Sequence, residues 1–553
     1  MNKSLIEKPA GCSSSILSRC RAAMLIGVSA ILGSSSSDAA MNVGQNLDGI
    51  TYYSSGSVFA NSFKACGAWL TSPVAGGAWD TGFGDKGPST DAAFVMRTDG
   101  YPTVVPFTAG GVSQYVHTLA PVYENGTHRL YFTGKGTVKY SGPGVAATTR
   151  VLTGGTVTFD VTVTGTNDLA AYNATGPSLR KGPSSWYIDI LVSNSTDPVR
   201  DIRIMRPGYN TSGRDTFDSD FKTKLGFYHT FRVMDWLRTN NSPYTKFANT
   251  NGKDGTGIGK DFYSQGTGRG VSVDHICDLA NETAKNIWIC VPHAFTNAGM
   301  NDMAASFASK IGVGRKVHVE YSNEVWNGMF QQATWVAANV SGANTPQKYG
   351  TKAAEVFTAF KTKFDAAGKG SQLNRTLAGQ AANSWILDNS LITAGSLTDS
   401  IAIAPYFGKV FTSLPSPLPT MDQLATDTYT IMPSVRSWLD SHKTLALSKG
   451  KVLLCYEGGQ HYVGTGGSEN NEALTDLLVD FNRDWRMKNL YRYTYMGDVN
   501  SRGVQLFTAF TLSSQWGKWG SWGSMEWLKQ PIGPNSYEAG KEWGIRDWKT
   551  NNP

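Results

Sequence analysis

The chain has 553 residues, a mass of 59.8 kDa and a formal charge of +7, with 40% hydrophobic and 17% charged side chains. This ordinary globular composition excludes a disordered or collagen-like chain. Because the mild positive charge contains no run of Lys or Arg, the sequence also argues against nucleic acid as a partner.

Residues 1–40 have the pattern of an export signal. Basic residues precede an apolar stretch of 12 residues at 22–33, and small residues follow up to Ala40. Twelve residues are too few to cross a bilayer, which needs about 20, but they suit the apolar region of a signal peptide. We therefore predict a secreted or periplasmic protein with no membrane span after removal of the signal.

Residues 41–199 are predicted to form an N-terminal antiparallel β-sandwich domain. Short segments of alternating polar and apolar residues are separated there by Gly, Pro, Asn and Asp, a pattern typical of such domains. The clearest of these segments are 128–133, 137–140, 155–164 and 186–193.

Residues 200–553 are predicted to form a (β/α)8 TIM barrel, because apolar strands alternate there with segments of helical periodicity. The strand candidates are 201–207, 230–236, 286–292, 316–323, 375–381, 400–406, 451–457 and 503–510. Examples of the helical segments are 273–284, 303–311 and 353–367. The segment 251–270 holds seven glycines but lacks the Lys-Ser/Thr ending of a phosphate-binding loop, so we interpret it as a loop above the barrel.

The cysteines and histidines give no sign of a metal site. Cys66, Cys277, Cys290 and Cys455 remain after the predicted signal, which is too few for a disulfide scaffold, although one bridge is possible. No metal-ligand spacing is present, and we expect neither a metal nor another cofactor.

Two carboxylates follow predicted barrel strands, where the active sites of such barrels lie. Glu324 follows the fourth strand and Glu457 ends the seventh. The alternation of residues along 451–457 predicts that Glu457 faces the barrel interior. In the fourth strand, the residues on the same face as Glu324 are polar, so an inward-facing Glu324 requires either a polar barrel interior or a bulge near Ser322. A lone glutamate here would more often form a salt bridge, but two facing carboxylates are what hydrolysis of a glycosidic bond requires, one protonated and one ionised.

The segment 319–327 (VEYSNEVWN) resembles the Asn-Glu signature of the clan A glycoside hydrolases, the 4/7 superfamily. This resemblance implies that Glu324 is the acid/base, that Glu457 is the nucleophile of a retaining mechanism, and that Asn323 binds the sugar 2-hydroxyl. Together with 231–236, 291–294 and 455–459, the segment also makes the chain similar to bacterial secreted proteins loosely described as cellulose-binding.

The resemblance also implies roles for other residues at strand ends. His293 follows the third strand, where the clan commonly has a site histidine, and Tyr406 ends the sixth, where a tyrosine often contacts the nucleophile. Ala404 departs from the clan, which frequently has a histidine there. Trp516 best matches the tryptophan that the clan places after the eighth strand, beneath the reacting sugar, since indole faces stack on sugar rings.

Four further residues are candidates with alternative structural roles. Arg206 and Arg232 could each keep the nucleophile ionised. Gln380 and Asn383, near the fifth strand, could contact sugar hydroxyls. Trp326 is expected to pack behind Glu324.

The leading hypothesis is a secreted retaining glycoside hydrolase acting on a carbohydrate polymer or oligosaccharide, for which we expect β-linkages. One alternative is a non-catalytic, lectin-like carbohydrate-binding protein, which Trp516 and the neighbouring Trp519, Trp522 and Trp527 fit equally well. Another is an inverting enzyme or a lyase on the same barrel. A retaining pair would place the two carboxyl groups about 5–5.5 Å apart.

Overall fold

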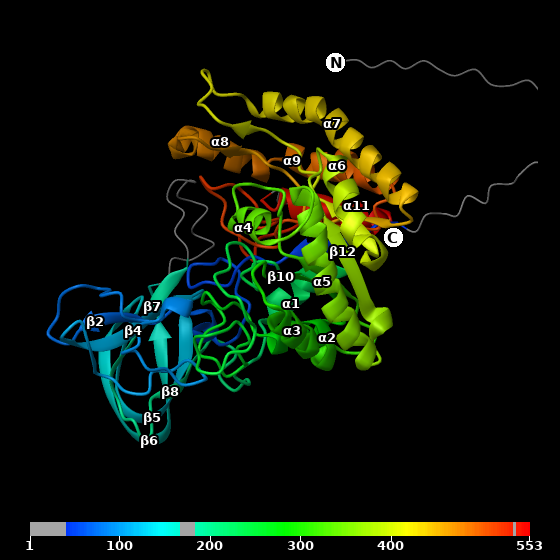
Figure 1. Cartoon of the computed structure of the whole chain (residues 1–553). Helices are drawn as coiled ribbons and strands as arrows, with labels where there is room; N and C mark the ends of the chain where they lie inside the picture. The colour runs from blue at the N-terminus through cyan, green and yellow to red at the C-terminus, as the bar shows by residue number, and fades with distance from the viewer. Residues whose placement is uncertain (1–39, 166–182, 535–537) are drawn as a thin grey trace, which may run out of the picture. The chain divides into compact units, whose positions relative to one another are not determined.

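The computed structural model describes residues 40–165, 183–534 and 538–553 (Figure 1). The predicted signal peptide at 1–40 therefore lies outside the described residues, apart from Ala40. Within the described ranges, no helix is both long enough and apolar enough to cross a membrane.

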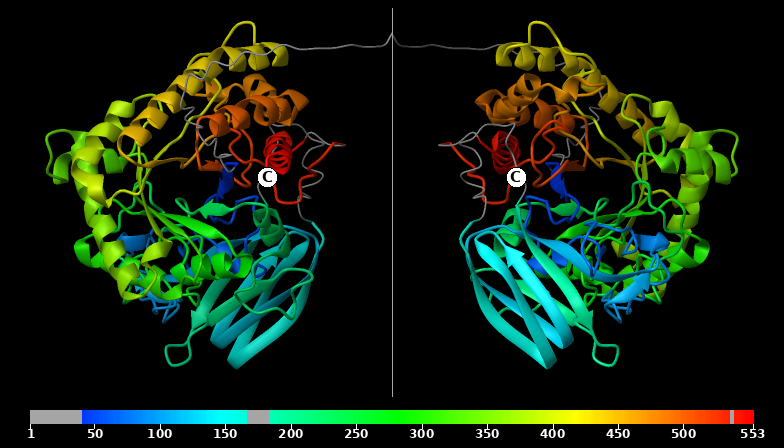
Figure 2. Two further views of the ribbon diagram at one scale, coloured as in Figure 1. Left: turned by 90° about the vertical axis from the view of Figure 1, so that its right-hand side faces the viewer. Right: turned by 90° about the vertical axis from the view of Figure 1, so that its left-hand side faces the viewer.

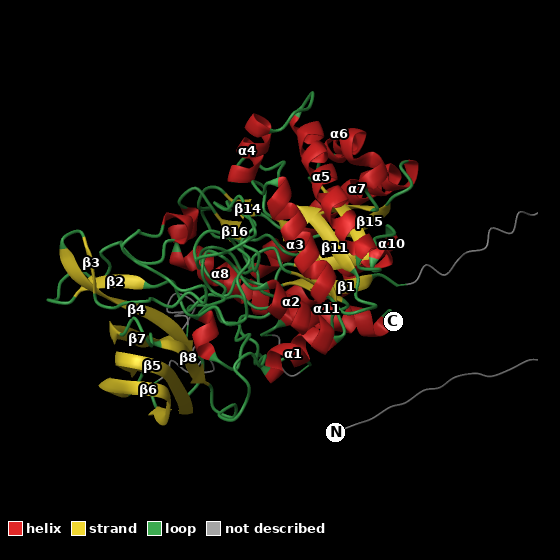
Figure 3. Ribbon diagram, turned by 60° about the horizontal axis from the view of Figure 1, so that its bottom comes forward, coloured by secondary structure: helices red, strands yellow, loops and turns green. Residues whose placement is uncertain are grey.

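Eight parallel strands close into a barrel with helices around it (Figure 3), which confirms the predicted (β/α)8 architecture. In order around the barrel they are β1 (Asn42–Asn46), β17 (Leu506–Ala509), β15 (Val452–Cys455), β13 (Ser400–Ile403), β12 (Leu373–Ala378), β11 (Val317–Tyr321), β10 (Asn286–Val291) and β9 (Thr230–Arg232). A separate parallel pair joins β14 (Val410–Phe411) to β16 (Val463–Gly464).

The helices include the segments expected from their periodicity, which correspond to α2, α3 and α5. The described α-helices are α1 (Ser219–Gly226), α2 (Val273–Thr283), α3 (Asn297–Lys310), α4 (Gln331–Asn339), α5 (Thr345–Ala366), α6 (Ser384–Ala394), α7 (Met421–Ser448), α8 (Glu472–Arg483), α9 (Trp485–Asn489), α10 (Met496–Ser501) and α11 (Gly540–Asn551).

The prediction that residues 201–207 form the first strand of the barrel is wrong. That segment contains β8 (Arg200–Met205), which pairs antiparallel with a strand outside the barrel. The barrel instead begins with β1, which pairs with β17 and β9. Hydrophobic patterning misses β1 because Gln45 and Asn46 are buried polar residues, each held by hydrogen bonds to other side chains or carbonyls.

The other strands form an antiparallel sheet, as predicted for the N-terminal region. They are β2 (Leu70–Pro73), β3 (Phe107–Ala109), β4 (Val112–Val122), β5 (Gly126–Gly142), β6 (Val145–Val163), β7 (Ser184–Ser193) and β8. Hydrogen bonds join all seven into one branched sheet, whose cyan strands lie side by side in Figure 2. A sandwich of two separate sheets is thus matched only in part. Since these strands fall between β1 and β9 along the chain, the antiparallel sheet is an insertion into the barrel. The predicted boundary at 199/200 does not separate the two sheets, because β1 of the barrel precedes it and β8 of the antiparallel sheet follows it.

The glycine-rich loop helps to build the core of this sheet rather than simply covering the barrel. Ile258, Phe262 and Tyr263 are buried in the same apolar cluster as Trp69 and Trp186. Farther along the loop, Arg269 forms an ion pair of 2.9 Å with Asp85, and both side chains are fully buried.

We predict that Asp85→Asn lowers the free energy of unfolding by about 3–5 kcal/mol, because removing one partner leaves a buried charge unpaired. Urea denaturation followed by circular dichroism would measure the change. Glu282→Gln is the control, since the Lys222–Glu282 pair (3.2 Å) is solvent-exposed and such pairs contribute at most about 1 kcal/mol. Equal effects of the two substitutions would contradict the prediction.

Candidate active site

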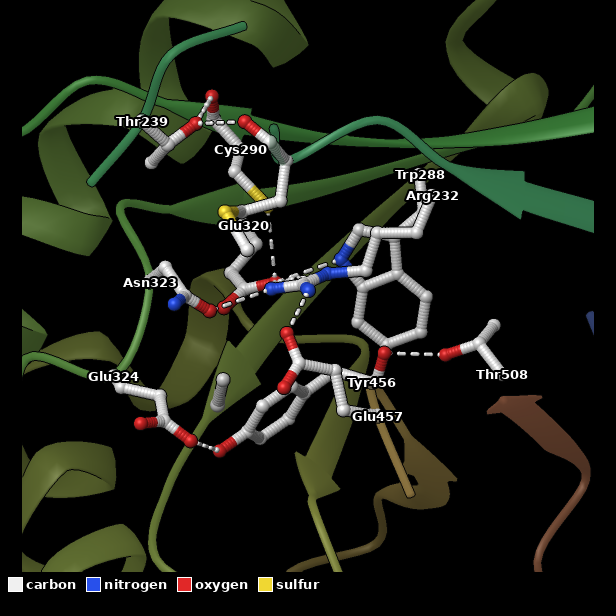
Figure 4. A network of polar contacts seen from close by, with 12 residues as sticks. Arg232, Thr239, Trp288, Cys290, Glu320, Asn323, Glu324, Tyr456, Glu457 and Thr508 are labelled. Carbon is white, nitrogen blue, oxygen red and sulfur yellow. Dashed lines mark hydrogen bonds and ion pairs between the residues drawn. The ribbon is translucent and has the colours of Figure 1, made fainter. Parts of the chain in front are cut away.

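The side chain of Arg232, at the end of β9, lies at the centre of a buried polar network (Figure 4). Its guanidinium donates to Glu457 Oε1 at 2.6 Å and to Asn323 Oδ1 at 2.9 Å. It also donates to Glu320 Oε2 at 2.9 and 3.2 Å and to Asn46 Oδ1 at 3.1 Å. One guanidinium thus joins side chains from the ends of three other barrel strands.

Glu320 makes the barrel interior polar beneath the predicted catalytic pair. Its Oε2 accepts hydrogen bonds from Trp288 Nε1 at 2.9 Å and from the Cys290 thiol at 3.4 Å, as well as from Arg232. Burial raises the pKa of Glu320, and the charge of Arg232 acts in the opposite direction. A buried carboxyl group requires such partners, because an unpaired one would be strongly destabilising.

Glu457 is held from both sides. Arg232 forms an ion pair with Oε1, and the Tyr406 hydroxyl donates to Oε2 at 2.9 Å. Asn46 Nδ2 donates to the carbonyl oxygen of the preceding residue, Tyr456, at 3.0 Å. The carboxylate therefore has one fixed orientation at the carboxyl end of β15.

Glu324 lies in a strained segment that begins directly after β11. Ser322 and Glu324 have φ values of +58° and +43°, a left-handed conformation that costs a non-glycine residue about 1–3 kcal/mol and clusters at functional sites. Asn327 Nδ2 donates to Glu324 Oε2 at 3.0 Å, and the Tyr456 hydroxyl donates to Oε1 at 3.1 Å. The sequence left two explanations for an inward-facing Glu324, a polar barrel interior or a bulge near Ser322. The structure has features of both, since Glu320 is a polar residue of the interior and the chain leaves strand geometry at Ser322.

The two carboxyl groups have different surroundings. Burial, together with the nearby charge of Glu457, raises the pKa of Glu324 to about 7. Glu324 therefore retains a substantial protonated fraction at neutral pH, whereas Glu457 is paired with a guanidinium. Opposed environments of this kind distinguish a general acid from a carboxylate nucleophile or stabilising anion.

Asn323 is fixed by residues that the sequence pattern does not reveal. Its Nδ2 donates to Asn240 Oδ1 at 3.1 Å. Gln332, in α4, donates to the same Asn240 oxygen at 2.6 Å and to the Asn323 carbonyl at 2.8 Å. Neither Asn240 nor Gln332 follows a barrel strand directly, so no motif identifies them in the sequence.

His293 is buried where it follows β10. Its ring packs edge-on against Trp335 at 5.5 Å, and burial lowers its pKa to about 4. Nδ1 has no hydrogen-bond partner among the described residues. The imidazole is thus neutral at physiological pH and retains hydrogen-bonding capacity.

Trp522, rather than Trp516, adjoins the residues around Glu457. The Trp522 ring lies 6.3 Å from that of Tyr406 and 4.9 Å from that of His461. Trp516 is buried, with its indole N–H donating to a backbone carbonyl and the Lys541 ammonium 4.4 Å from its ring. Between residues 183 and 534, no hydrogen bond or ring contact joins Trp516 to either catalytic candidate. The spacing of the tryptophans alone could not distinguish these two positions.

Arg206 and Gln380 differ from the other candidates. Arg206 forms ion pairs with Glu124 and Asp218 at the edge of the antiparallel sheet, so Arg232 and not Arg206 holds Glu457. Gln380 is half-buried two residues beyond β12, and its contact with a sugar hydroxyl stays a prediction.

The four cysteines of the described chain are all buried free thiols. In the same residues, no group of three or more His, Cys, Asp and Glu side chains is placed to hold a metal ion.

The fold has distant likenesses among solved glycoside hydrolases, including families 51 and 26 of clan A. A family 51 arabinofuranosidase from Xanthomonas axonopodis pv. citri is 12% identical with a TM-score of 0.37, over 55% of this chain and 62% of its own. The chain thus spans less than two thirds of that protein. The catalytic domain of a family 26 endo-β-1,4-mannanase from Bacillus sp. JAMB-750 is 12% identical with a TM-score of 0.32, over 60% and 81%. A Bacteroides uniformis β-glucuronidase is 10% identical with a TM-score of 0.33, over 75% and 46%.

No protein-family model matches the sequence, and the curated proteins give no match either. Structural likenesses at these identities do not define a reaction or a substrate.

We predict that Glu457→Gln lowers the pKa of Glu324 from about 7 toward its ordinary value, because the substitution removes the neighbouring negative charge while burial remains. Carbon NMR titration of the glutamate carboxyl groups would measure it. Glu469→Gln, in the short 3-10 helix Ser468–Asn470 before α8, should leave the titration unchanged. An unchanged pKa of Glu324 in the Glu457→Gln variant would mean that burial alone raises it.

Proposed function

We propose that this protein is a retaining glycoside hydrolase that cleaves a β-linked polysaccharide or oligosaccharide. The observation that carries the proposal is the pairing of a half-buried carboxyl group with a pKa of about 7 and a carboxylate bound to a buried guanidinium, both at the mouth of a parallel barrel. The export pattern of residues 1–40 supports action outside the cytoplasm.

In the first step, a Glu457 oxygen attacks the anomeric carbon and the bond to the leaving oxygen breaks. Glu324 transfers its proton to that oxygen, so the leaving group departs as a neutral alcohol. Glu324 is then ionised, and Glu457 is esterified to the sugar.

In the second step, water attacks the anomeric carbon and gives its proton to Glu324. The bond to Glu457 breaks, and both carboxyl groups return to their starting states. The net reaction consumes one water per bond cleaved and retains the anomeric configuration. These two steps require no cofactor.

The surrounding residues have positioning roles in this scheme. Arg232 and Tyr406 orient the nucleophile through their hydrogen bonds to its two oxygens. Asn323 is itself fixed by Arg232 and Asn240, and we assign it to the sugar 2-hydroxyl, where a hydrogen bond that strengthens in the transition state accelerates the reaction. His293 and Trp522 are candidates for further sugar contacts.

Reducing-sugar release from β-glucans, mannans, xylans, arabinans and bacterial exopolysaccharides would test the proposal. We predict release from one substrate class by the wild type, a loss of about 10²–10⁴-fold in Glu324→Gln, and no release by Glu457→Gln. Glu469→Gln should retain wild-type activity.

Other outcomes would support the alternative hypotheses. Sugar binding without release, unaltered in Glu457→Gln, would indicate a lectin-like protein. Inverted anomeric configuration in proton NMR would indicate an inverting enzyme, and an unsaturated product would indicate a lyase.

We predict that activity falls as the pH rises through about 7, because only protonated Glu324 can supply the proton that the leaving group needs. The measurement is kcat/KM between pH 4 and 9 on the substrate found above. The residual activity of Glu324→Gln on the same substrate should lack this alkaline limb, because the amide that replaces the carboxyl group does not titrate. An alkaline limb that persists in Glu324→Gln would assign it to another group.

A further inference from the structure

One face of the inserted antiparallel sheet carries exposed aromatic rings. The strands β2, β4, β7, β5 and β6 follow one another across this sheet (Figure 3). Along β7, Trp186, Ile188 and Ile190 are buried in the core of the sheet. Because side chains alternate along a strand, Tyr187 and Asp189 lie on the opposite face, which we call the outer face. Tyr187 is 45% exposed there.

Trp79, from the loop after β2, lies over the outer face next to Tyr187. Its ring centre is 4.0 Å from that of His117, on β4, and 5.9 Å from that of Tyr187, to which the indole is nearly perpendicular at 78°. Tyr115, also on β4, contacts the same imidazole edge-on at 5.8 Å. Trp79 nevertheless remains 51% exposed, so the indole packs partly on the sheet and is otherwise in contact with solvent.

Hydrogen bonds fix the loop that holds Trp79. The Ser72 hydroxyl, on β2, donates to the Trp79 carbonyl oxygen at 2.7 Å. Two residues farther on, the Thr81 amide donates to the Thr71 carbonyl at 2.9 Å, and the hydroxyl oxygens of these two threonines are 2.7 Å apart. The indole is therefore held in place before any ligand binds, which lowers the entropic cost of binding.

His117 supports Trp79 without a hydrogen bond of its own. It is 1% exposed, and neither ring nitrogen has a hydrogen-bond partner among the described residues. Burial lowers its pKa, so the ring is neutral at physiological pH. A buried polar ring without partners destabilises a fold, and exposed apolar patches are typical of binding surfaces. Folding stability alone does not explain this pair of rings, which favours a role in binding.

The polar groups beside the rings suit a ligand rich in hydroxyl groups. Asp189 forms an ion pair of 3.2 Å with Lys139, on β5, and the strand register places Asp189 opposite His117. The pair neutralises its own charge, while its ammonium group and carboxylate can still exchange hydrogen bonds with hydroxyl groups. Asp80, beside Trp79 in the sequence, adds a carboxylate, so an anionic ligand is disfavoured.

A neutral sugar polymer matches this combination of rings and polar groups. The apolar face of a sugar ring stacks on an exposed indole, and its hydroxyl groups bind the polar side chains alongside. A protein partner would require more surface. Even if fully covered, Trp79 and Tyr187 would supply about 300–500 Å², which is below the roughly 800 Å² per partner of a standard protein interface.

We propose that Trp79 and Tyr187 form a carbohydrate-binding platform on the inserted sheet, with Lys139 and Asp189 as hydrogen-bonding partners of the sugar hydroxyl groups. Its ligand is the neutral β-linked polysaccharide that the barrel cleaves, so the proposal rests on the glycosidase function proposed above. The platform residues come from β5, β7 and the loop after β2, which are not barrel strands. The platform therefore retains the enzyme on the polymer and takes no part in bond cleavage.

The test is affinity electrophoresis of the Glu457→Gln variant, which does not consume its ligand, in gels that contain β-glucan, mannan, xylan or arabinan. We expect one of these polymers to retard the protein, and the further substitution Trp79→Ala to weaken that binding about 10-fold. Trp79→Phe, which keeps an aromatic face, should lose less. Trp485→Ala is the matched control, because Trp485 is 48% exposed on α9.

Kinetics with Glu457 intact give a second readout. Trp79→Ala should raise KM for the polymer about 10-fold. The same variant should retain kcat/KM on a 4-nitrophenyl glycoside of the same sugar within a factor of two, because a single sugar requires only the active site.

Equal binding with and without Trp79, or no binding to any of the polymers, would overturn the platform. A dimer in size-exclusion chromatography that Trp79→Ala converts to a monomer would also overturn it, and would assign the face to contact between two copies of the chain. The proposed function fails separately. Platform binding without reducing-sugar release by the wild type would overturn the glycosidase function alone, and release without any effect of Trp79→Ala would overturn the platform alone.

Discussion

The burial of the Arg232 guanidinium is the constraint on which the rest of the site depends. A cation without access to water must be surrounded by acceptors, or it destabilises the fold by several kcal/mol. The acceptors are supplied by Asn46, Glu320, Asn323 and Glu457, which come from three separated barrel strands or the turns that follow them. The same contacts that neutralise the charge thus fix the position of one catalytic candidate and of the asparagine beside the other.

This network also explains why two similar side chains differ. Glu457 is bound directly to the guanidinium, whereas the hydrogen bonds that Glu324 receives from the described residues come only from a neutral amide and a phenol. The burial of Glu324 and the charge of Glu457 therefore outweigh these hydrogen bonds, and the pKa of Glu324 rises to about 7. The left-handed backbone at Glu324 is part of the same arrangement, since strain of this kind persists only where surrounding contacts enforce it.

The inserted antiparallel sheet leaves the barrel closure unchanged. β1 and β9 are separated by more than 180 residues, yet they pair in register, with Asn46 opposite Arg232. The insertion is anchored by a second buried ion pair, Arg269–Asp85, and by aromatic residues of the loop that follows β9. Barrel and sheet are thus joined through both apolar packing and charge pairing.

The sequence alone determined seven barrel strands and the antiparallel character of the inserted sheet, because alternating patterns are local signals. Strand-end carboxylates are local signals too, and they indicated two glutamates as catalytic candidates. Only the tertiary structure decided that β1 opens the barrel, since its buried polar residues hide the apolar pattern. It also decided that Arg232, and not Arg206, contacts Glu457, and that Trp522, and not Trp516, lies against Tyr406. Each of those pairs is equivalent in local pattern, and the members differ only in which distant residues they contact.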